Sequence, residues 1–234
     1  MTYSVCLTDG DAHGVAVATK AIAVGSTAPF VSRDGAVCTQ AMTSSPLGVR
    51  TIRSLTAGTP IEEAIEREFE TDEHASVRQL HGVDAAGGSA VRTGDNCVDW
   101  AGHLTGDGYS IAGNMLCGAE VLDSMEAALT GVPDAPVGDR LLAALLAGAD
   151  AGGDKRGEHE QSSALLVFDP DDPQLAHDLR VDDHENAVAE LERLYGVASE
   201  DGARWLEQYP RANIQRHPLV NQDPGGSGCE DGSD

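Results

Sequence analysis

The first residues of the chain carry groups that can attack a carbonyl carbon. Removal of Met1 would leave Thr2 with a hydroxyl and a free α-amino group on one residue. A threonine hydroxyl is a poor nucleophile until a base takes its proton. An α-amino group titrates at roughly 7.7–8.0, close to working pH, so it can be that base. The alternative is an ordinary edge strand in a protein that begins Met-Thr.

A lysine is placed to act on this amine. Residues 2–8 alternate apolar and polar side chains, and together with the largely apolar stretch 15–20 they predict two strands joined by a turn within 9–14. Antiparallel pairing would bring Thr2 and Lys20 to the same open end of this hairpin. An ammonium there would lower the pKa of the Thr2 amine and keep it unprotonated. The alternative for Lys20 is a salt-bridged residue at a strand end.

Polar residues at the ends of two later strands could complete such a site. Thr39, Gln40 and Ser44 follow a predicted strand over 35–41, where backbone N–H groups or the Gln40 amide could stabilise an oxyanion. An ordinary polar turn explains them equally well. Asn114 ends a strand that begins at Tyr109, and its amide could orient the Thr2 amine or simply serve a turn.

The glycine-rich segment 152–161 could overhang a pocket, because it precedes a strongly apolar strand that begins at Ser162. Arg156 could pair with a substrate carboxylate, and Gln161 would lie beside it; a solvated turn is the alternative. The spacing is not that of a phosphate-binding loop. Asp182-Asp183-His184 are adjacent in sequence and would not converge on one ion, so we expect no metal and no cofactor.

The remaining pattern alternates groups of strands with pairs of helices. Further strands are expected over 77–83, 89–93 and 179–181. Helices are expected over 45–57, from a Thr59-Pro60-Ile61-Glu62 capping box onward, around Val121–Leu129 and around Leu141–Leu146. A last helix is expected over 186–195, with Gly196 as its cap. The first two helices would cover one face of a sheet. The pattern indicates an α+β fold.

One domain with a tail is expected from 234 residues. We place the domain at 2–196 and an extension at 197–220. Residues 221–234 are rich in Gly, Asp and Ser, which is typical of a disordered segment.

The composition limits the classes of molecule that the protein is expected to bind. The net charge of −24 would repel nucleic acid and anionic lipid, and an acidic excess with two lysines resembles the proteins of salt-loving organisms. No apolar run approaches ~18 residues, so no membrane span is expected. The five cysteines form no CxxC pair and no signal sequence is seen, which favours reduced thiols in the cytoplasm. A small-molecule substrate is the expected partner, and homo-oligomerisation stays open.

Several stretches, in order along residues 2 to about 195, carry a resemblance to a known family. They are Thr2-Tyr3-Ser4-Val5, Gly14–Lys20 with Ala23-Val24-Gly25, Cys38-Thr39-Gln40-Ala41, Arg78-Gln79-Leu80, Thr93-Gly94, Trp100-Ala101-Gly102-His103, Gly113-Asn114-Met115-Leu116, Gly152–Gly157, Gln161–Leu166 and Leu179–His184. The chain resembles the N-terminal nucleophile (Ntn) hydrolases, in particular domain-of-unknown-function family 1028. The resemblance implies a four-layer αββα sandwich and an amidohydrolase acting on a small C–N bond.

Within that resemblance Thr2 would be the nucleophile, with Lys20, Gln40 and Asn114 in catalysis and the remaining site residues at the substrate: Thr39, Ser44, Arg156 and Gln161. Two other functions remain. The chain could be a binding or assembly protein in which Thr2 is structural. It could also be an enzyme that uses Cys38 or Cys117.

Overall fold

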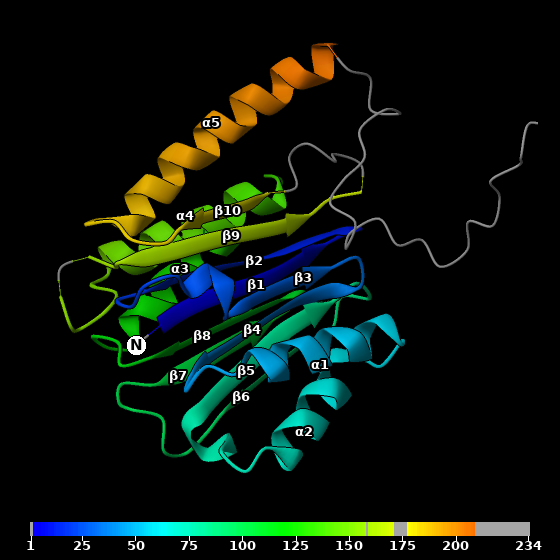
Figure 1. Cartoon of the computed structure of the whole chain (residues 1–234), viewed down its shortest axis with the longest axis vertical. Coiled ribbons are helices and arrows are strands. Elements are labelled where there is room, and N and C mark those ends of the chain that lie inside the picture. The colour runs from blue at the N-terminus through cyan, green and yellow to red at the C-terminus, as the bar shows by residue number, and fades with distance from the viewer. Residues whose placement is uncertain (1, 158, 171–176, 209–234) are drawn as a thin grey trace, which may run out of the picture.

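Two antiparallel sheets and five α-helices make up the chain over residues 2–157, 159–170 and 177–208, which the computed structural model describes (Figure 1). The six-stranded sheet has the order β10-β9-β2-β1-β8-β7, and the four-stranded sheet has the order β3-β4-β5-β6. The mixed α+β class predicted from the sequence is confirmed.

The strands are β1 (Thr2–Asp9), β2 (Ala12–Thr19), β3 (Pro29–Ser32), β4 (Gly35–Ala41), β5 (Arg78–Asp84), β6 (Ser89–Thr93), β7 (Gly102–Gly106), β8 (Tyr109–Asn114), β9 (Ser162–Phe168) and β10 (Asp178–Val181). The α-helices are α1 (Ser45–Thr56), α2 (Ile61–Thr71), α3 (Glu120–Gly131), α4 (Val137–Asp150) and α5 (Ala187–Gln208); Val24–Ser26 and Ala75–Val77 form short 3-10 helices.

The six-stranded sheet is organised around β1, which pairs with β2 on one side and β8 on the other. The predicted hairpin is confirmed, with a shorter turn than expected: Gly10 and Asp11 alone connect the two strands. Gly10 has a φ of 57°, a left-handed conformation that glycine adopts without steric cost. This register places Thr2 opposite Thr19 at the open end.

β1 buries its two faces in different surroundings. Tyr3, Val5 and Leu7 pack into a large apolar cluster that includes buried side chains of α3 and α4. Full burial of such side chains contributes roughly 1.5–3 kcal/mol each. Cys6 points the other way, into a smaller cluster that contains Cys38 of the four-stranded sheet. The period-two alternation of the sequence therefore separates a helix-facing side from a sheet-facing side.

The helices divide between the sheets. The α4 helix contacts β1, β2 and β9, α3 contacts β8 and β7, and α5 contacts β9 and β10. On the other side, α1 and α2 contact the four-stranded sheet, as expected for the first two helices. The two sheets contact each other chiefly through β1, β2, β4, β5 and β8, as Figure 1 also shows. The start of β1 therefore lies where the sheets meet.

The predicted capping box of α2 is wrong. The N-cap is Pro60, and no side chain of the first turn makes a cap hydrogen bond. The Ile61 N–H instead donates to Asp84 Oδ2 at 3.0 Å. Asp84 ends β5, so a tertiary contact supplies the acceptor that we expected from a neighbouring residue.

Gly196 does not end the last helix, because α5 continues from Ala187 to Gln208 without a break. A glycine costs about 1 kcal/mol within a helix but does not stop it. The strands β3 and β7 were not expected; both are short edge strands. The 221–234 tail lies outside the described residues.

No helix in the described ranges is both long enough and apolar enough to cross a membrane.

Candidate functional site

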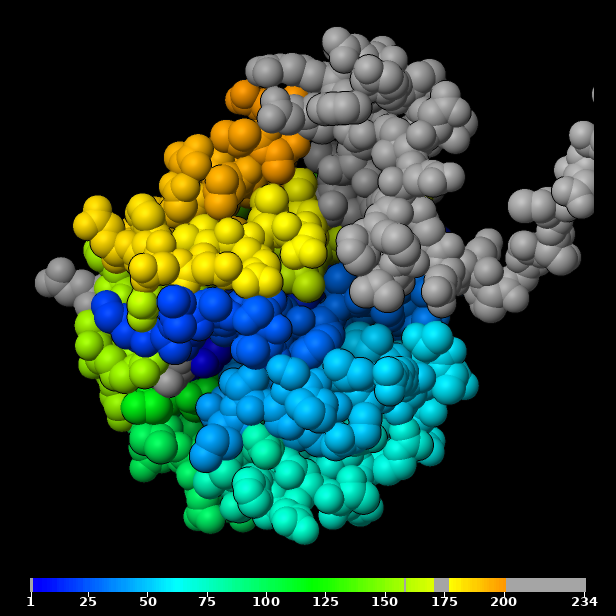
Figure 2. Space-filling model, viewed as in Figure 1, coloured from blue at the N-terminus to red at the C-terminus, as the bar shows by residue number. Residues whose placement is uncertain are grey.

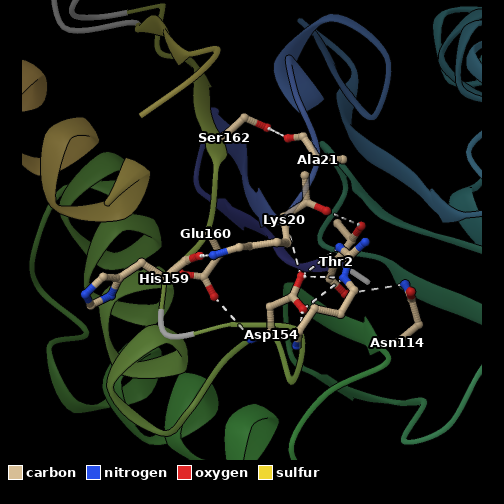
Figure 3. Close-up of polar contacts among 10 residues, drawn as sticks. Thr2, Lys20, Ala21, Asn114, Asp154, His159, Glu160 and Ser162 are labelled. Atoms are coloured by element: carbon tan, nitrogen blue, oxygen red, sulfur yellow. Dashed lines mark hydrogen bonds and ion pairs between the residues drawn. The ribbon is translucent and has the colours of Figure 1, made fainter. Parts of the chain in front are cut away.

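Thr2 begins β1 and lies between two neighbouring strands. Its backbone pairs with Thr19 of β2 and with Asn114 of β8. Figure 3 shows Asn114 beside Thr2. The Thr2 hydroxyl donates to Thr19 Oγ1 at 3.2 Å, and Thr2 is 7% exposed. The Thr19 hydroxyl therefore orients the Thr2 hydroxyl, while activation still requires a base.

Lys20 follows Thr19 directly, at the expected end of the hairpin. Its backbone N–H donates to Asp154 Oδ2 at 3.0 Å. Its ammonium donates to the His159 carbonyl at 2.5 Å, and Figure 3 shows the side chain extended toward His159. The structure thus brings Lys20 to the same end as Thr2, with its charge directed along the segment that precedes β9.

Asp154 is a residue of this region that the sequence analysis missed. It is 1% exposed. Besides the Lys20 N–H, its oxygens accept from the Arg156 guanidinium at distances of 2.8–3.2 Å. A buried carboxylate needs such partners, because an unpaired charge is costly to desolvate. The available signal was an acid directly before Lys155 and Arg156 in a glycine-rich segment.

Arg156 therefore has a protein partner for its guanidinium, and its predicted contact with a substrate carboxylate stays a prediction. Gln161 lies at the base of the same segment. Its side-chain amide donates to Asp183 Oδ1 at 2.8 Å, and its backbone N–H donates to the Thr19 carbonyl at 2.9 Å. The backbone of Gln161 borders the Thr2 end, while its side chain binds another loop.

Asn114 is tied to Thr2 and to the second sheet. Its Nδ2 donates to the Thr2 carbonyl at 3.4 Å and to Gln79 Oε1 at 2.9 Å. Gln79 Oε1 also accepts from Gln40 Nε2 at 3.0 Å. All three amides are at most 2% exposed. Gln79 of β5 is thus a hub between the sheets, and the sequence analysis assigned it no role.

The polar chain continues between the sheets beyond Gln40. Ser4 Oγ donates to Gln40 Oε1 at 2.6 Å and lies 2.7 Å from His81 Nε2, while His81 Nδ1 lies 2.9 Å from Ser110 Oγ. Burial, together with the nearby His103, lowers the pKa of His81 to about 3. His81 is therefore neutral near pH 7, and the buried side chains of Ser4, His81 and Ser110 are all hydrogen-bonded.

Thr39 and Ser44 are joined by one hydrogen bond. The Ser44 N–H donates to Thr39 Oγ1 at 3.2 Å, and Ser44 is the N-cap of α1. Thr39 is fully buried on β4. These contacts shape the loop after β4, and the predicted substrate contacts of both residues stay predictions.

The match to a family model covers residues 2–191, most of the chain. That model is described as a family of unknown function, DUF1028. The chain belongs to this family. A crystal structure of a DUF1028 protein from Silicibacter pomeroyi matches with 32% sequence identity and a TM-score of 0.80, covering 89% of this chain and 94% of that chain.

A second solved structure, of Thiobacillus denitrificans BPH in complex with epoxomicin, matches with 13% identity and a TM-score of 0.42, covering 72% of this chain and 98% of that chain. Among curated proteins, no sequence matches the chain.

Strained backbone gathers at the Thr2 end of this DUF1028 chain. Over the described residues, the non-glycine residues with positive φ are Ala23 at 57°, Ala41 at 66° and Met115 at 56°. Ala41 ends β4 after Gln40, Met115 follows Asn114, and Ala23 lies three residues after Lys20. Such conformations cost of order 1–3 kcal/mol each and concentrate at functional sites. They support a site formed by the loops around Thr2.

A cavity of about 550 Å³ lies at the opposite end of β1 of the DUF1028 fold. It is lined by the turns after β1, β5 and β7, with Thr8, Asp9 and Arg140 among its residues. Arg140 Nη1 donates to Asp9 Oδ2 at 2.9 Å. None of the predicted site residues lines this cavity.

Metal ligands do not cluster in the part of the chain that the structure describes: no three His, Cys, Asp or Glu side chains converge there as an ion would need. The four described cysteines are free, and burial raises the pKa of Cys38 to about 12. Cys38 is therefore a thiol near neutral pH, which disfavours it as a nucleophile.

Proposed function

We propose that this DUF1028 protein is an Ntn-type amidohydrolase that cleaves an amide-like C–N bond of a small molecule. We also propose that its two sheets and helices form the four-layer αββα sandwich of that class. The observation that carries the proposal is the place of Thr2, at the start of a central strand, where two packed sheets meet. A nucleophile there is rigidly held and borders several loops.

The reaction begins after Met1 is removed. The Thr2 α-amine takes the proton of the Thr2 hydroxyl as the oxygen attacks the substrate carbonyl. The resulting ammonium donates that proton to the leaving nitrogen as the C–N bond breaks, which leaves an ester on Thr2. A water then attacks the ester, with the same amine as base, and releases the acid product.

Two neighbours tune this amine. The positive charge of Lys20 disfavours the protonated amine and lowers its pKa. The Lys20 ammonium is hydrogen-bonded to the His159 carbonyl. Its effect on the pKa of the Thr2 amine is therefore that of a nearby charge and needs no direct hydrogen bond. The Asp154 carboxylate accepts from the Lys20 backbone N–H and so fixes the position of the end of β2.

Negative charge on the substrate oxygen requires donors. The side-chain amide of Gln40 is bonded to Ser4 and Gln79, and the N–H groups of Met42 and Ser44 donate to Val77 and Thr39. We therefore assign the oxyanion donor to the Thr43 backbone N–H, in the loop that follows β4. Backbone donors of this kind contribute about 10²–10³-fold to rate.

A second candidate function is a non-catalytic binding protein of the same fold. One observation favours it: the side-chain amides of Gln40 and Asn114, both expected in the site, are hydrogen-bonded to other residues of the same chain. In that case Thr2 would only begin a strand. Intact-mass analysis separates the two functions, since retained Met1 blocks the amine.

The test of the proposed function is hydrolysis of a panel of amides, lactams and ureido compounds in high salt. Thr2→Ala should abolish turnover, and Thr2→Ser should retain part of it because the hydroxyl and amine remain. Thr8→Ala is the matched control: Thr8 is also buried on β1 but lies at its other end. Normal turnover by Thr2→Ala would exclude Thr2 as the nucleophile.

A further inference from the structure

Large apolar side chains are exposed at few places in the described structure, and the most exposed of them surround Thr2. They are Ile22 (67%), Val98 (57%) and Met42 (56%), followed by Val197 (45%) and Val132 (44%). Single exposed apolar residues need no explanation, whereas a group of them around one site marks a binding surface. The first three residues each lie on a different side of Thr2.

Ile22 lies on the β2 side. Thr19 pairs with Thr2, and Ile22 follows three residues later. Its neighbours are fixed: the Ala21 carbonyl accepts from Ser162 Oγ at 2.5 Å, and the Ala23 N–H donates to the Asp182 carbonyl at 2.9 Å. A short, anchored loop therefore presents Ile22 to solvent just past the open end.

Met42 lies on the side of the facing sheet. Cys38 and Cys6 share one cluster, and Gln40 is bonded to Ser4, so β4 and β1 run in opposite directions across the interface. Continuing by two residues brings Met42 level with Thr2. The Met42 backbone is held there by its N–H bond to the Val77 carbonyl at 3.0 Å.

Val98 lies on the β8 side. Asn114 pairs with Thr2, and the next residue, Met115, donates its N–H to the Val98 carbonyl at 3.0 Å. Figure 2 shows the darkest blue atoms, at the start of β1, between the blue segment after β2 and the paler blue segment after β4. The strand start thus reaches the surface among these loops.

We propose that Ile22, Met42 and Val98, the apolar rim, bind an apolar substituent of the substrate, next to the bond that Thr2 attacks. The inference rests on the proposed function and gives that site a substrate class: small amides with an aliphatic or aromatic group beside the scissile carbonyl. Fully polar ureido compounds would lack the group that the rim covers.

A second copy of the chain is a poorer occupant of this rim. Both lysines of the chain, Lys20 and Lys155, lie beside it, and Lys155 donates to the carbonyl of Asp99, next to Val98. Neither backbone carbonyl neutralises the charge. A two-fold contact through this face would bring these lysines toward those of the partner, which is unfavourable.

The test uses 4-nitroanilides with unbranched acyl groups of two to six carbons, measured by calorimetry on Thr2→Ala and by turnover on the wild-type chain. Binding to Thr2→Ala requires no hydrolysis. We expect the dissociation constant to fall about two- to fourfold with each added methylene, up to about 0.8 kcal/mol. Adding Met42→Ser or Val98→Ser should flatten this dependence, and Val132→Ser, remote from Thr2, should preserve it.

The outcomes separate the two proposals. If the dissociation constant depends on acyl chain length, the rim variants flatten this dependence and the wild-type protein shows no turnover, the apolar rim is supported and the hydrolase is not. Turnover without any dependence on chain length overturns the rim. So does a dependence that Met42→Ser and Val98→Ser leave unchanged. The rim proposal is also overturned if sedimentation shows that these two substitutions dissociate an oligomer, while the dissociation constant of the anilides does not depend on acyl chain length. This face would then be an interface between copies of the chain.

Discussion

Thr2 and Thr8 are the same residue type at opposite ends of β1, and their surroundings differ. Around Thr8, positive φ angles belong to glycines in tight turns, such as Gly10 and Gly108, where they cost little. Around Thr2, Ala23, Ala41 and Met115 also have positive φ angles, and in these residues the same conformation is strained. The first end follows the local rules of turn formation, and the second breaks them.

The cavity at the Thr8 end does not coincide with the strained residues. The cavity of about 550 Å³ lies at the Thr8 end, whereas the buried amide chain, the exposed apolar rim and both lysines lie at the Thr2 end. Proteins tend to violate local preferences at functional sites and to compensate elsewhere. The proposed site therefore does not coincide with this cavity.

The largest expected effect concerns the histidines. His81 belongs to the chain that leads to Thr2, whereas His13 pairs with Thr8; burial lowers both pKa values, that of His81 to about 3. Because unfolding lets His81 take up a proton below pH ~6.5, its contribution to stability is present above that pH. It is lost at about 1.4 kcal/mol per pH unit as the pH falls toward 3.

The measurement is urea unfolding at pH 7, 6 and 5. His81→Gln, which can still bond to Ser4 and Ser110, should reduce the loss of stability between pH 6.5 and 5, and more strongly than His13→Gln does. Equal slopes for wild type and His81→Gln would contradict a neutral, buried His81.

The two ends of β5 provide the next comparison. Gln79 joins the amide chain near Thr2, while Asp84 accepts from the N–H groups of Ile61, Ala86 and Gly88 at the other end. Replacing either residue by Ala should cost about 2–3 kcal/mol, because buried partners lose hydrogen bonds. Only Gln79→Ala should also lower kcat, by about tenfold, with KM little changed. A similar fall in kcat for Asp84→Ala would erase the distinction between the ends.

A cation at each end gives a third comparison. Lys20→Ala should slow hydrolysis about 10–100-fold and move the pH optimum upward, since loss of the ammonium raises the pKa of the Thr2 amine. Arg140→Ala, which breaks the contact with Asp9, should leave the rate within about twofold. A pH–rate profile for each variant tests this expectation. An unshifted optimum for Lys20→Ala would show that Lys20 does not lower the pKa of the Thr2 amine.

The smallest effect concerns the backbone. Ala41→Gly should stabilise the fold by about 1 kcal/mol, because glycine adopts the observed φ of 66° without strain. Gly10→Ala should destabilise it by about 1 kcal/mol; an added Cβ meets no atom within 4 Å, so the cost is conformational alone. Thermal unfolding of both variants checks this. Destabilisation by Ala41→Gly would show that the strain at the Thr2 end is misassigned.

Local patterns predicted much of this fold. The bounds of β4 and the start of β9 match the sequence analysis, since glycine punctuation and apolar runs define them within a few residues. The edge strands β3 and β7 carry weaker patterns and were missed. Gln79, His81 and Asp154 have roles that depend on which sheet faces meet and which loops touch. Residues far apart in sequence decide those contacts, and no spacing within one segment reports them.

The most direct test of Thr2 as an activated nucleophile is mass spectrometry of the chain after reaction with an alkyl β-lactone. Attack by the Thr2 hydroxyl opens the ring at its carbonyl, forms an ester and passes the hydroxyl proton to the released alkoxide, so the whole lactone mass is added. We predict a chain without Met1 and one adduct, mapped to Thr2. The adduct should be absent from Thr2→Ala and present in Thr8→Ala. Retained Met1, or an adduct on Cys117 with none on Thr2, would contradict the account.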